Sequence, residues 1–96
     1  MEARGLHNEV HTGPMWINIE CYYPIPRGTP KSKRQMMEDG KILPMVKPDL
    51  DNVAKSILDA LNGLAFMDDK QIVFMHTTKR YDSTPRVVVD LGRQYT

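Results

Sequence analysis

The sequence predicts a small α+β domain, in which one main helix packs on a mixed or antiparallel sheet. Three observations lead to this prediction: apolar and polar residues alternate at 15–23, apolar residues recur at helical spacing at 52–61, and β-branched residues dominate 71–81 and 86–91. The chain has 96 residues, 41% of them hydrophobic, enough for one domain with a small core. Because a small core leaves apolar surface poorly covered, we also expect a dimer.

The segment 1–14 mixes charged residues, His and Gly without periodicity, so we expect an irregular lead-in before a single domain at 15–96. In the first strand, Ile17, Ile19, Cys21 and Tyr23 form one apolar face. The Pro- and Gly-rich segment that follows it ends regular structure and opens a basic loop. A short extended piece at 42–46 contains a proline, which restricts it to a sheet edge.

The main helix is expected from Asn52 to Leu61, with Asp51 or Asn52 as its N-cap. Asn62-Gly63 is a strong stop signal, and Gly63 suits the left-handed position after the helix. The segment 71–81 reads as a strand. After a turn at 82–85, the Val-rich segment 86–91 reads as its hairpin partner.

Composition excludes several classes of protein. Net charge is +1, so overall charge does not indicate nucleic-acid binding. The single cysteine, Cys21, cannot form an internal disulfide and lies outside any zinc pattern, which favours a reducing, cytoplasmic setting. No apolar run reaches the roughly 18 residues of a membrane-spanning helix, so no membrane partner is expected.

Acidic residues flank the main helix on both sides. Asp49 and Asp51 are two positions apart just where the helix begins, and Asp68-Asp69 follow its end. If residues 62–69 return along the helix, Asp49, Asp51 and Asp69 can converge. Asp68 is the alternative candidate to Asp69. Converging carboxylates repel one another unless a cation with oxygen preference neutralises them, which predicts Mg²⁺, with Mn²⁺ able to substitute. The alternative is that these residues only cap a helix and form a turn.

A calcium-binding loop is a further reading of Asp49-Leu50-Asp51-Asn52, and it fails. Such a loop needs Gly at its sixth position and Glu at its twelfth, where this chain has Ala54 and Ala60.

Basic residues gather in two segments, and together they are expected to form a phosphate-binding rim. The alternative is a solvated surface. The expected DNA-binding residues are Arg27, Lys31, Lys33, Arg34, Lys79 and Arg80.

The motif at 47–63 reads KPDLDNVAKSILDALNG, and it is followed by DDKQIV at 68–73 and KRY at 79–81. These residues resemble the signature of the RusA-type Holliday junction resolvases: K-P-D-x-D-N-x-x-K, then D-A-L-N-G, then D-D-x-Q-(I/V). The resemblance extends over about 16–91. It implies a homodimeric, magnesium-dependent endonuclease, often carried by phages and prophages, that cuts two strands of a four-way DNA junction in recombination and repair.

The resemblance also implies the roles of individual residues. The family's essential residues fall on Asp49, Asp51, Lys55 and Asp69, with the three aspartates as metal ligands. Family members usually carry a further strand and a helix before the strand at Met15, so the resemblance suggests an N-terminally truncated member with an open sheet edge. Two rival hypotheses therefore stay open: a catalytically inactive DNA-binding relic of the same fold, and a small interaction module with a purely structural acidic cluster.

Overall fold

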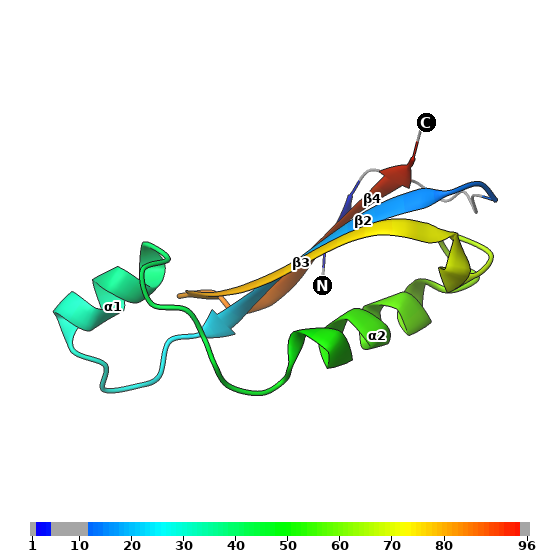
Figure 1. Ribbon diagram of the computed structural model, residues 1–96. Helices are drawn as coiled ribbons and strands as arrows, with labels where there is room; N and C mark the ends of the chain where they lie inside the picture. Colours follow the sequence, from blue (N-terminus) through cyan, green and yellow to red (C-terminus); the bar gives the residue numbers. More distant parts are fainter. Residues whose placement is uncertain (1, 5–11, 95–96) are drawn as a thin grey trace.

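The computed structural model describes residues 2–4 and 12–94, and Figure 1 shows the arrangement of its elements. A four-stranded sheet has the order β1-β4-β2-β3 and carries helix α2 along one face, with α1 beyond its end. The described molecule is elongated, 48 × 22 × 20 Å. The elements in chain order are β1 (Glu2–Arg4), β2 (Met15–Pro24), α1 (Lys31–Glu38), α2 (Leu50–Leu61), the 3-10 helix η1 (Asp69–Gln71), β3 (Ile72–Asp82) and β4 (Arg86–Arg93).

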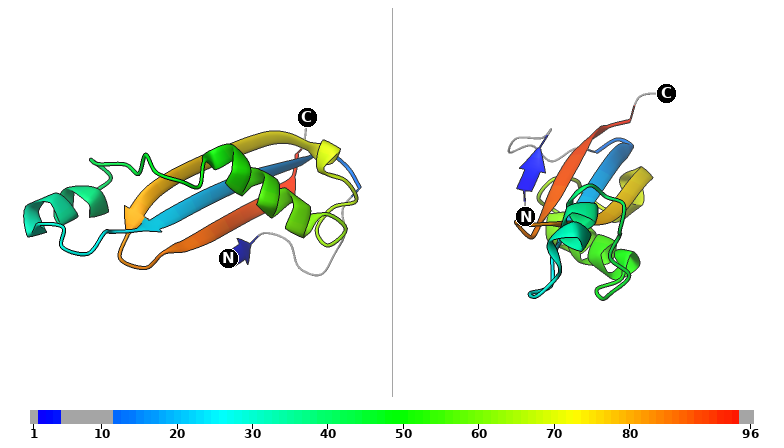
Figure 2. Two further views of the ribbon diagram at one scale, coloured as in Figure 1. Left: turned by 90° about the horizontal axis from the view of Figure 1, so that it is seen from below. Right: turned by 90° about the vertical axis from the view of Figure 1, so that its left-hand side faces the viewer.

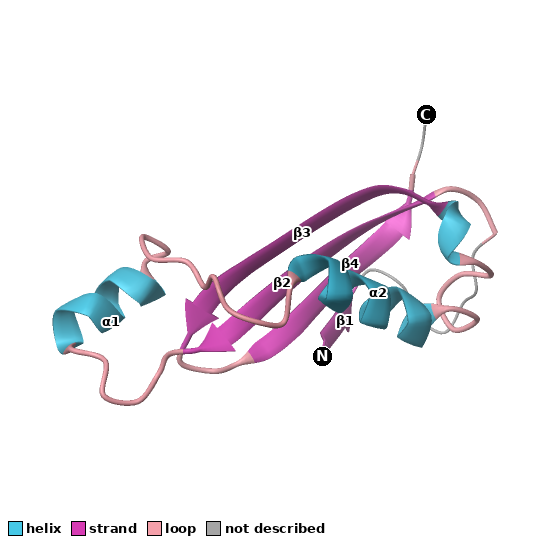
Figure 3. Ribbon diagram, turned by 60° about the horizontal axis from the view of Figure 1, so that its bottom comes forward, coloured by secondary structure: helices cyan, strands magenta, loops and turns pink. Residues whose placement is uncertain are grey.

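The core lies between β2 and α2, as the alternating pattern predicts. Side chains at alternate positions of β2, from Met15 to Tyr23, are buried on the face that α2 covers. The helix contributes Ala54, Ile57 and Leu61 to the same core. Figure 3 shows α2 lying against this face of the sheet. The predicted α+β class with one main helix is therefore confirmed.

The predicted hairpin between the last two strands is wrong. β2 lies between them, pairing parallel with β3 and antiparallel with β4. Strands two places apart in a sheet are roughly 9.6 Å apart. Residues 83–85 can bridge that gap, because each residue of extended chain covers about 3.3 Å. A short turn was therefore not evidence for direct pairing. The parallel pairing makes the whole segment between β2 and β3, including both α-helices, a crossover connection.

The basic segment is not wholly a loop, because helix α1 begins at Lys31. Residues 31–38 read KSKRQMME, which is rich in good helix formers, and Pro30 precedes them at the N-cap. Met37 is buried, so the helix has an anchor. Residues 42–46, expected as an edge strand, form no strand. They run beside β3 as irregular chain, with Pro44 fully buried.

The ends of α2 agree with the prediction to within two residues. The helix begins at Leu50, so Asp49 takes the N-cap position, although its side chain makes no capping hydrogen bond. Gly63 follows the helix with φ of +82°, a left-handed conformation that favours glycine.

The lead-in is not irregular throughout. Glu2–Arg4 form β1, which pairs parallel with β4 and extends the sheet at that edge (Figure 2). The signal was missed because three residues are too few to show a strand period. The rest of the predicted lead-in up to residue 11 lies outside the described residues. Among the helices of the described residues, none has the length and apolarity to cross a membrane.

Candidate active site

The loop that leads into α2 is held by two side chains from the sheet. The Tyr23 hydroxyl, at the end of β2, donates a hydrogen bond to the carbonyl oxygen of Pro48. The Lys79 ammonium, from β3, donates to the carbonyl oxygen of Val46 over 3.1 Å and lies 5.4 Å from the centre of the Tyr23 ring. These bonds connect the sheet to residues just before Asp49, so they anchor the segment that leads into α2.

The Tyr23 hydroxyl keeps its proton for this bond at neutral pH. Burial raises the pKa of Tyr23, and the charges of Cys21 and Asp49 raise it further. Burial also raises the pKa of the Cys21 thiol, against the opposing effect of the Lys79 charge. The Cys21 thiol is therefore neutral at neutral pH.

Asp49 and Asp51 are exposed at the start of α2, while Leu50 between them packs against the core. Leu50 is thus turned inward, and the two aspartates are left at the surface. The helix N-terminus carries a partial positive charge, which stabilises carboxylates there. Lys55 is one turn further along the same helix, and it is also exposed. Three of the four predicted catalytic residues thus belong to one short, solvent-facing segment.

Asp69 lies in η1, whose first turn is fixed by a capping box. The Asp68 carboxylate accepts a hydrogen bond of 2.9 Å from the backbone N–H of Lys70. The Gln71 side-chain oxygen accepts bonds from the backbone N–H groups of Met67 and Asp68. This hydrogen bond to Lys70 is the main reason that the pKa of Asp68 is lowered, and a hydrogen bond with Asp69 lowers it further. Asp68 is thus used as a cap, and Asp69 is exposed to solvent.

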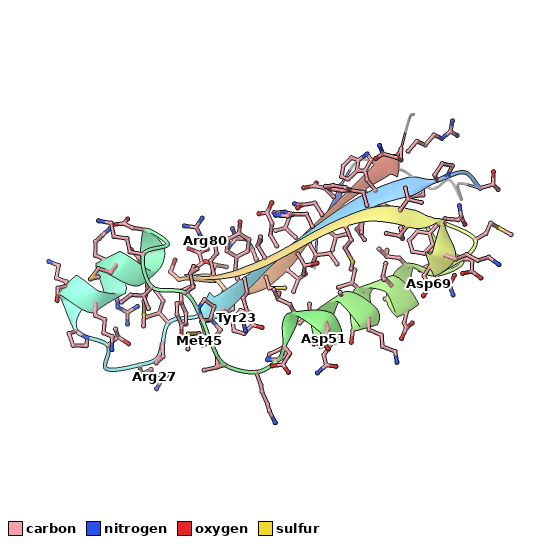
Figure 4. All side chains as sticks on the ribbon, in the orientation of Figure 1. Tyr23, Arg27, Met45, Asp51, Asp69 and Arg80 are labelled. Atoms are coloured by element: carbon pink, nitrogen blue, oxygen red, sulfur yellow. The ribbon has the colours of Figure 1, made fainter. Side chains whose placement is uncertain are left out.

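Asp69 does not meet Asp49 and Asp51 within one chain. Figure 4 shows Asp51 at the start of α2 and Asp69 beyond its other end. The helix has 12 residues, so its two ends are about 18 Å apart. Across the residues whose placement is described, no three acidic, His or Cys side chains form a group that could hold a metal ion. The single-chain convergence expected from the sequence is therefore wrong.

The physical reason lies in residues 62–66. The backbone N–H groups of Leu64 and Ala65 both donate to the carbonyl oxygen of Leu61, and Gly63 donates to that of Phe66. These bonds close a compact turn at the helix end, and Phe66 is fully buried there. The residues that could have led back along α2 are used in this turn, and it is β3 that runs back.

The predicted DNA-binding cations gather around the end of the molecule that carries α1. Arg27 lies just before α1, and Lys31, Lys33 and Arg34 form its first turn. Arg80 and Lys79 come from the last third of β3, and the Arg80 guanidinium donates to the carbonyl oxygen of Glu38, at the end of α1. Figure 4 shows Arg27 and Arg80 on the Asp51 side of the molecule, far from Asp69.

Tyr23 is a site-building residue that the sequence did not reveal. The alternating pattern of β2 predicts that Tyr23 lies in the core, and this is correct, since Tyr23 is 8% exposed. The bond of its hydroxyl to Pro48 joins residues 25 positions apart in the chain. No local pattern predicts a contact over that distance. The sequence contains one indication of a polar partner. Tyr23 ends a buried strand face, and a buried tyrosine hydroxyl usually has a hydrogen-bond partner.

Comparison with known families identifies the chain. The profile of a family described as endodeoxyribonuclease RusA matches residues 1–92. The chain belongs to the RusA family. A protein of Bacillus subtilis strain 168, named uncharacterized protein YqaN, is 40% identical to it over 80 residues. The aligned part is 81% of this chain and 56% of that relative, so the chain spans little more than half of its length. No solved structure matches the chain.

Proposed function

We propose that this RusA-family chain is a structure-specific endonuclease that resolves four-way DNA junctions by hydrolysing phosphodiester bonds. The main support is the family match over residues 1–92 together with the position of its signature. Asp49, Asp51 and Lys55 are exposed at the start of α2, where a phosphate backbone can reach all three.

The proposed cofactor is Mg²⁺, for which Mn²⁺ can substitute, with Asp49 and Asp51 as ligands from one chain. Hard carboxylate oxygens are the ligand type that Mg²⁺ prefers. When bound, such an ion polarises a phosphate and lowers the pKa of a water molecule. Lys55 supplies a fixed positive charge one helical turn away, where it can stabilise the charge that develops on the phosphate.

A third carboxylate is proposed to come from Asp69 of a second copy. Within one chain, a helix length separates Asp69 from the other two aspartates. Two antiparallel α2 helices related by a two-fold axis would place the end of one beside the start of the other. The proposed homodimer would then hold two equivalent sites, which is what two symmetric cuts across a junction require.

Binding of the DNA arms is assigned to the cations around α1. Arg27, Lys31 and Lys33 are exposed, and contacts from such residues to phosphates carry no base sequence. Junction shape would therefore be the main determinant of recognition, and affinity should fall steeply with salt concentration.

The experiment that tests the function uses Asp51→Asn, with Asp59→Asn as the matched control. Both residues are exposed aspartates of α2, eight positions apart. With a labelled four-way junction and Mg²⁺, we expect Asp51→Asn to lose cleavage but keep or strengthen binding, because one charge that repels phosphate is gone. Asp59→Asn should cut like the parent chain.

The other outcomes separate the rival hypotheses. A parent chain that binds junctions without cutting them would support the inactive DNA-binding relic. A parent chain that neither binds nor cuts would refute the proposal and favour a structural role for the acidic residues.

A further inference from the structure

A pocket of about 720 Å³ opens between the end of α1, the loop at 43–45 and the last third of β3. Its walls are mainly apolar, formed by Leu43, Pro44, Met45 and Leu50. Met45 is 91% exposed, so most of this apolar side chain meets solvent at the pocket. The volume lies in the range of small-molecule sites, and it is large enough for a nucleotide.

This pocket adjoins the candidate active site directly. Leu50, one of its walls, is the residue between Asp49 and Asp51. Since Leu50 turns toward the core and the two aspartates turn to solvent, the pocket and the carboxylates lie on neighbouring sides of one helix start. A nucleotide whose base enters the pocket would therefore keep its phosphates near the carboxylates.

The rim of the pocket is positively charged. Lys79 and Arg80 line it, and their hydrogen bonds run to the carbonyl oxygens of Val46 and Glu38, which carry no charge. An ammonium has three donors and a guanidinium five, so both groups keep donors for a phosphate. Asp39 is the acidic residue on the rim, and its Oδ1 accepts a bond from Gln35.

We infer that this pocket binds one unstacked nucleotide of the DNA substrate. The base would lie against Leu43, Met45 and Leu50, and a flanking phosphate would contact Lys79 or Arg80. Enzymes that take a base out of the stack hold it between apolar or aromatic side chains. The inference rests on the proposed function and adds to it a route by which the chain could sense the base near the cut.

A second copy of the chain is the competing occupant, since exposed apolar residues are also typical of interfaces. The positive charge of the rim favours the nucleotide over a second copy. Two like copies meeting at Lys79 and Arg80 would bring cations together, whereas a nucleotide supplies the opposite charge.

The test observes the pocket directly through methionine methyl groups. Protein labelled with ¹³C at its methionine methyls is titrated with single-stranded tetrathymidylate in the absence of metal, and with an abasic strand of the same length. Met75 is the matched control, because it is a second exposed methionine, 48% exposed on β3, and it does not line the pocket. We expect the Met45 signal to shift with the thymine strand several times more than with the abasic strand, and the Met75 signal to stay.

Two variants complete the test. Met45→Ala should weaken binding of tetrathymidylate, while Met75→Ala should not. Equal shifts with both strands, equal shifts of both methionines, or unchanged affinity of Met45→Ala would each overturn the inference. Loss of self-association in Met45→Ala would also overturn it, assigning the pocket to a second copy.

Because this titration needs no cleavage, its result is independent of the nuclease proposal. Cleavage of junctions without a base-dependent Met45 shift would support the proposed function and refute the nucleotide-binding pocket. A base-dependent shift without cleavage would support the nucleotide-binding pocket and refute the proposed nuclease function.

Discussion

Single side chains decide where the active-site segment begins. In the loop before α2, the Tyr23 hydroxyl and the Lys79 ammonium, both from the sheet, contact backbone carbonyl oxygens directly. The sequence predicts acidic site residues from their local spacing. It could not identify their anchors, because those come from strands that are distant along the chain.

We expect Tyr23→Phe to reduce junction cleavage more than it reduces stability. The ring still fills the core, and the loss of one hydroxyl bond costs about 1 kcal/mol of unfolding free energy. Cleavage should fall further because the Asp49 segment loses an anchor. Urea denaturation and a cleavage assay measure the two effects.

Tyr22→Phe is the control for that experiment. Its hydroxyl donates to Glu20 over 2.5 Å, on the other face of the sheet. A similar loss of stability with unchanged cleavage is expected. Equal cleavage defects in both variants would contradict a positioning role for Tyr23.

Lys55→Ala should hardly change stability, since the residue is exposed in mid-helix and Ala is the better helix former. Cleavage should fall by roughly 10² or more, on the order of 2.7 kcal/mol, as for loss of one preorganised donor. Lys41→Ala removes an exposed lysine outside the helices and should cut normally. Single-turnover cleavage rates provide the comparison. A Lys55→Ala rate equal to that of the parent would reduce Lys55 to a solvated surface residue.

At the scale of elements, the strongly periodic segments were predictable. β2 and α2 follow the sequence patterns closely, because one face of each is buried and the period of burial is visible in the residues. The partners of the strands were not predictable, since a turn of three residues fits both a hairpin and a step across β2. The predicted position of Asp69 was wrong for a related reason. Chain length allowed a return along α2, and the hydrogen bonds at 62–66 prevent it.

Gly63→Ala should destabilise the chain by about 1–2 kcal/mol, because an alanine at φ of +82° adopts the left-handed conformation. The space around Gly63 is open, so backbone strain is the whole effect. Gly13→Ala is the control, with equally open space and no positive φ. Thermal unfolding of both variants measures the difference, and equal melting temperatures would contradict the argument.

The capping box of η1 should be visible in a pH titration. The bond from the Lys70 N–H holds the pKa of Asp68 below its ordinary value of about 3.9. Since the folded-state pKa is lower than the unfolded one, the stabilisation is present above the unfolded pKa. It is lost as pH falls through the folded pKa. Carboxyl NMR of the folded chain should show the lowered pKa, and the same signal in urea should return to the ordinary range. An equal pKa in both states would contradict the cap.

At the scale of the whole molecule, the question is whether a second copy of the chain completes the acidic site. The acidic set is divided between the two ends of α2, and the sequence could not reveal this because residue spacing does not show which end of a helix a later turn occupies. The dimer was expected from the small core and from the family resemblance. The separation of Asp69 from Asp51 now gives a chemical reason for it.

Mixing two inactive variants tests whether sites form between copies. Asp51→Asn and Asp69→Asn should each fail to cut. In a mixed dimer with shared sites, one site carries both substitutions and the other carries neither. After co-refolding, random pairing should restore about a quarter of the parent's sites. The product should be a nicked junction, visible on a denaturing gel. No recovery, with mixed dimers shown to form, would place all the ligands in one chain.

Sedimentation at micromolar concentration should accompany this experiment, since the dimer is expected near 22 kDa, twice the 11.0 kDa of one chain. A clean, active monomer would rule out shared sites.

The position of β2 in the middle of the sheet also has a consequence for how the chain folds. β2 is synthesised before both of its principal neighbours, and the bond between Asn18 and His76 joins residues 58 positions apart. Such long-range pairing slows folding, because the entropy of closing a long loop is lost before the contacts form. On the ribosome, both edges of β2 must therefore wait, unpaired, until β3 and β4 emerge. During that interval the nascent chain is most exposed to aggregation, and holdase chaperones would find their binding segment at residues 15–24.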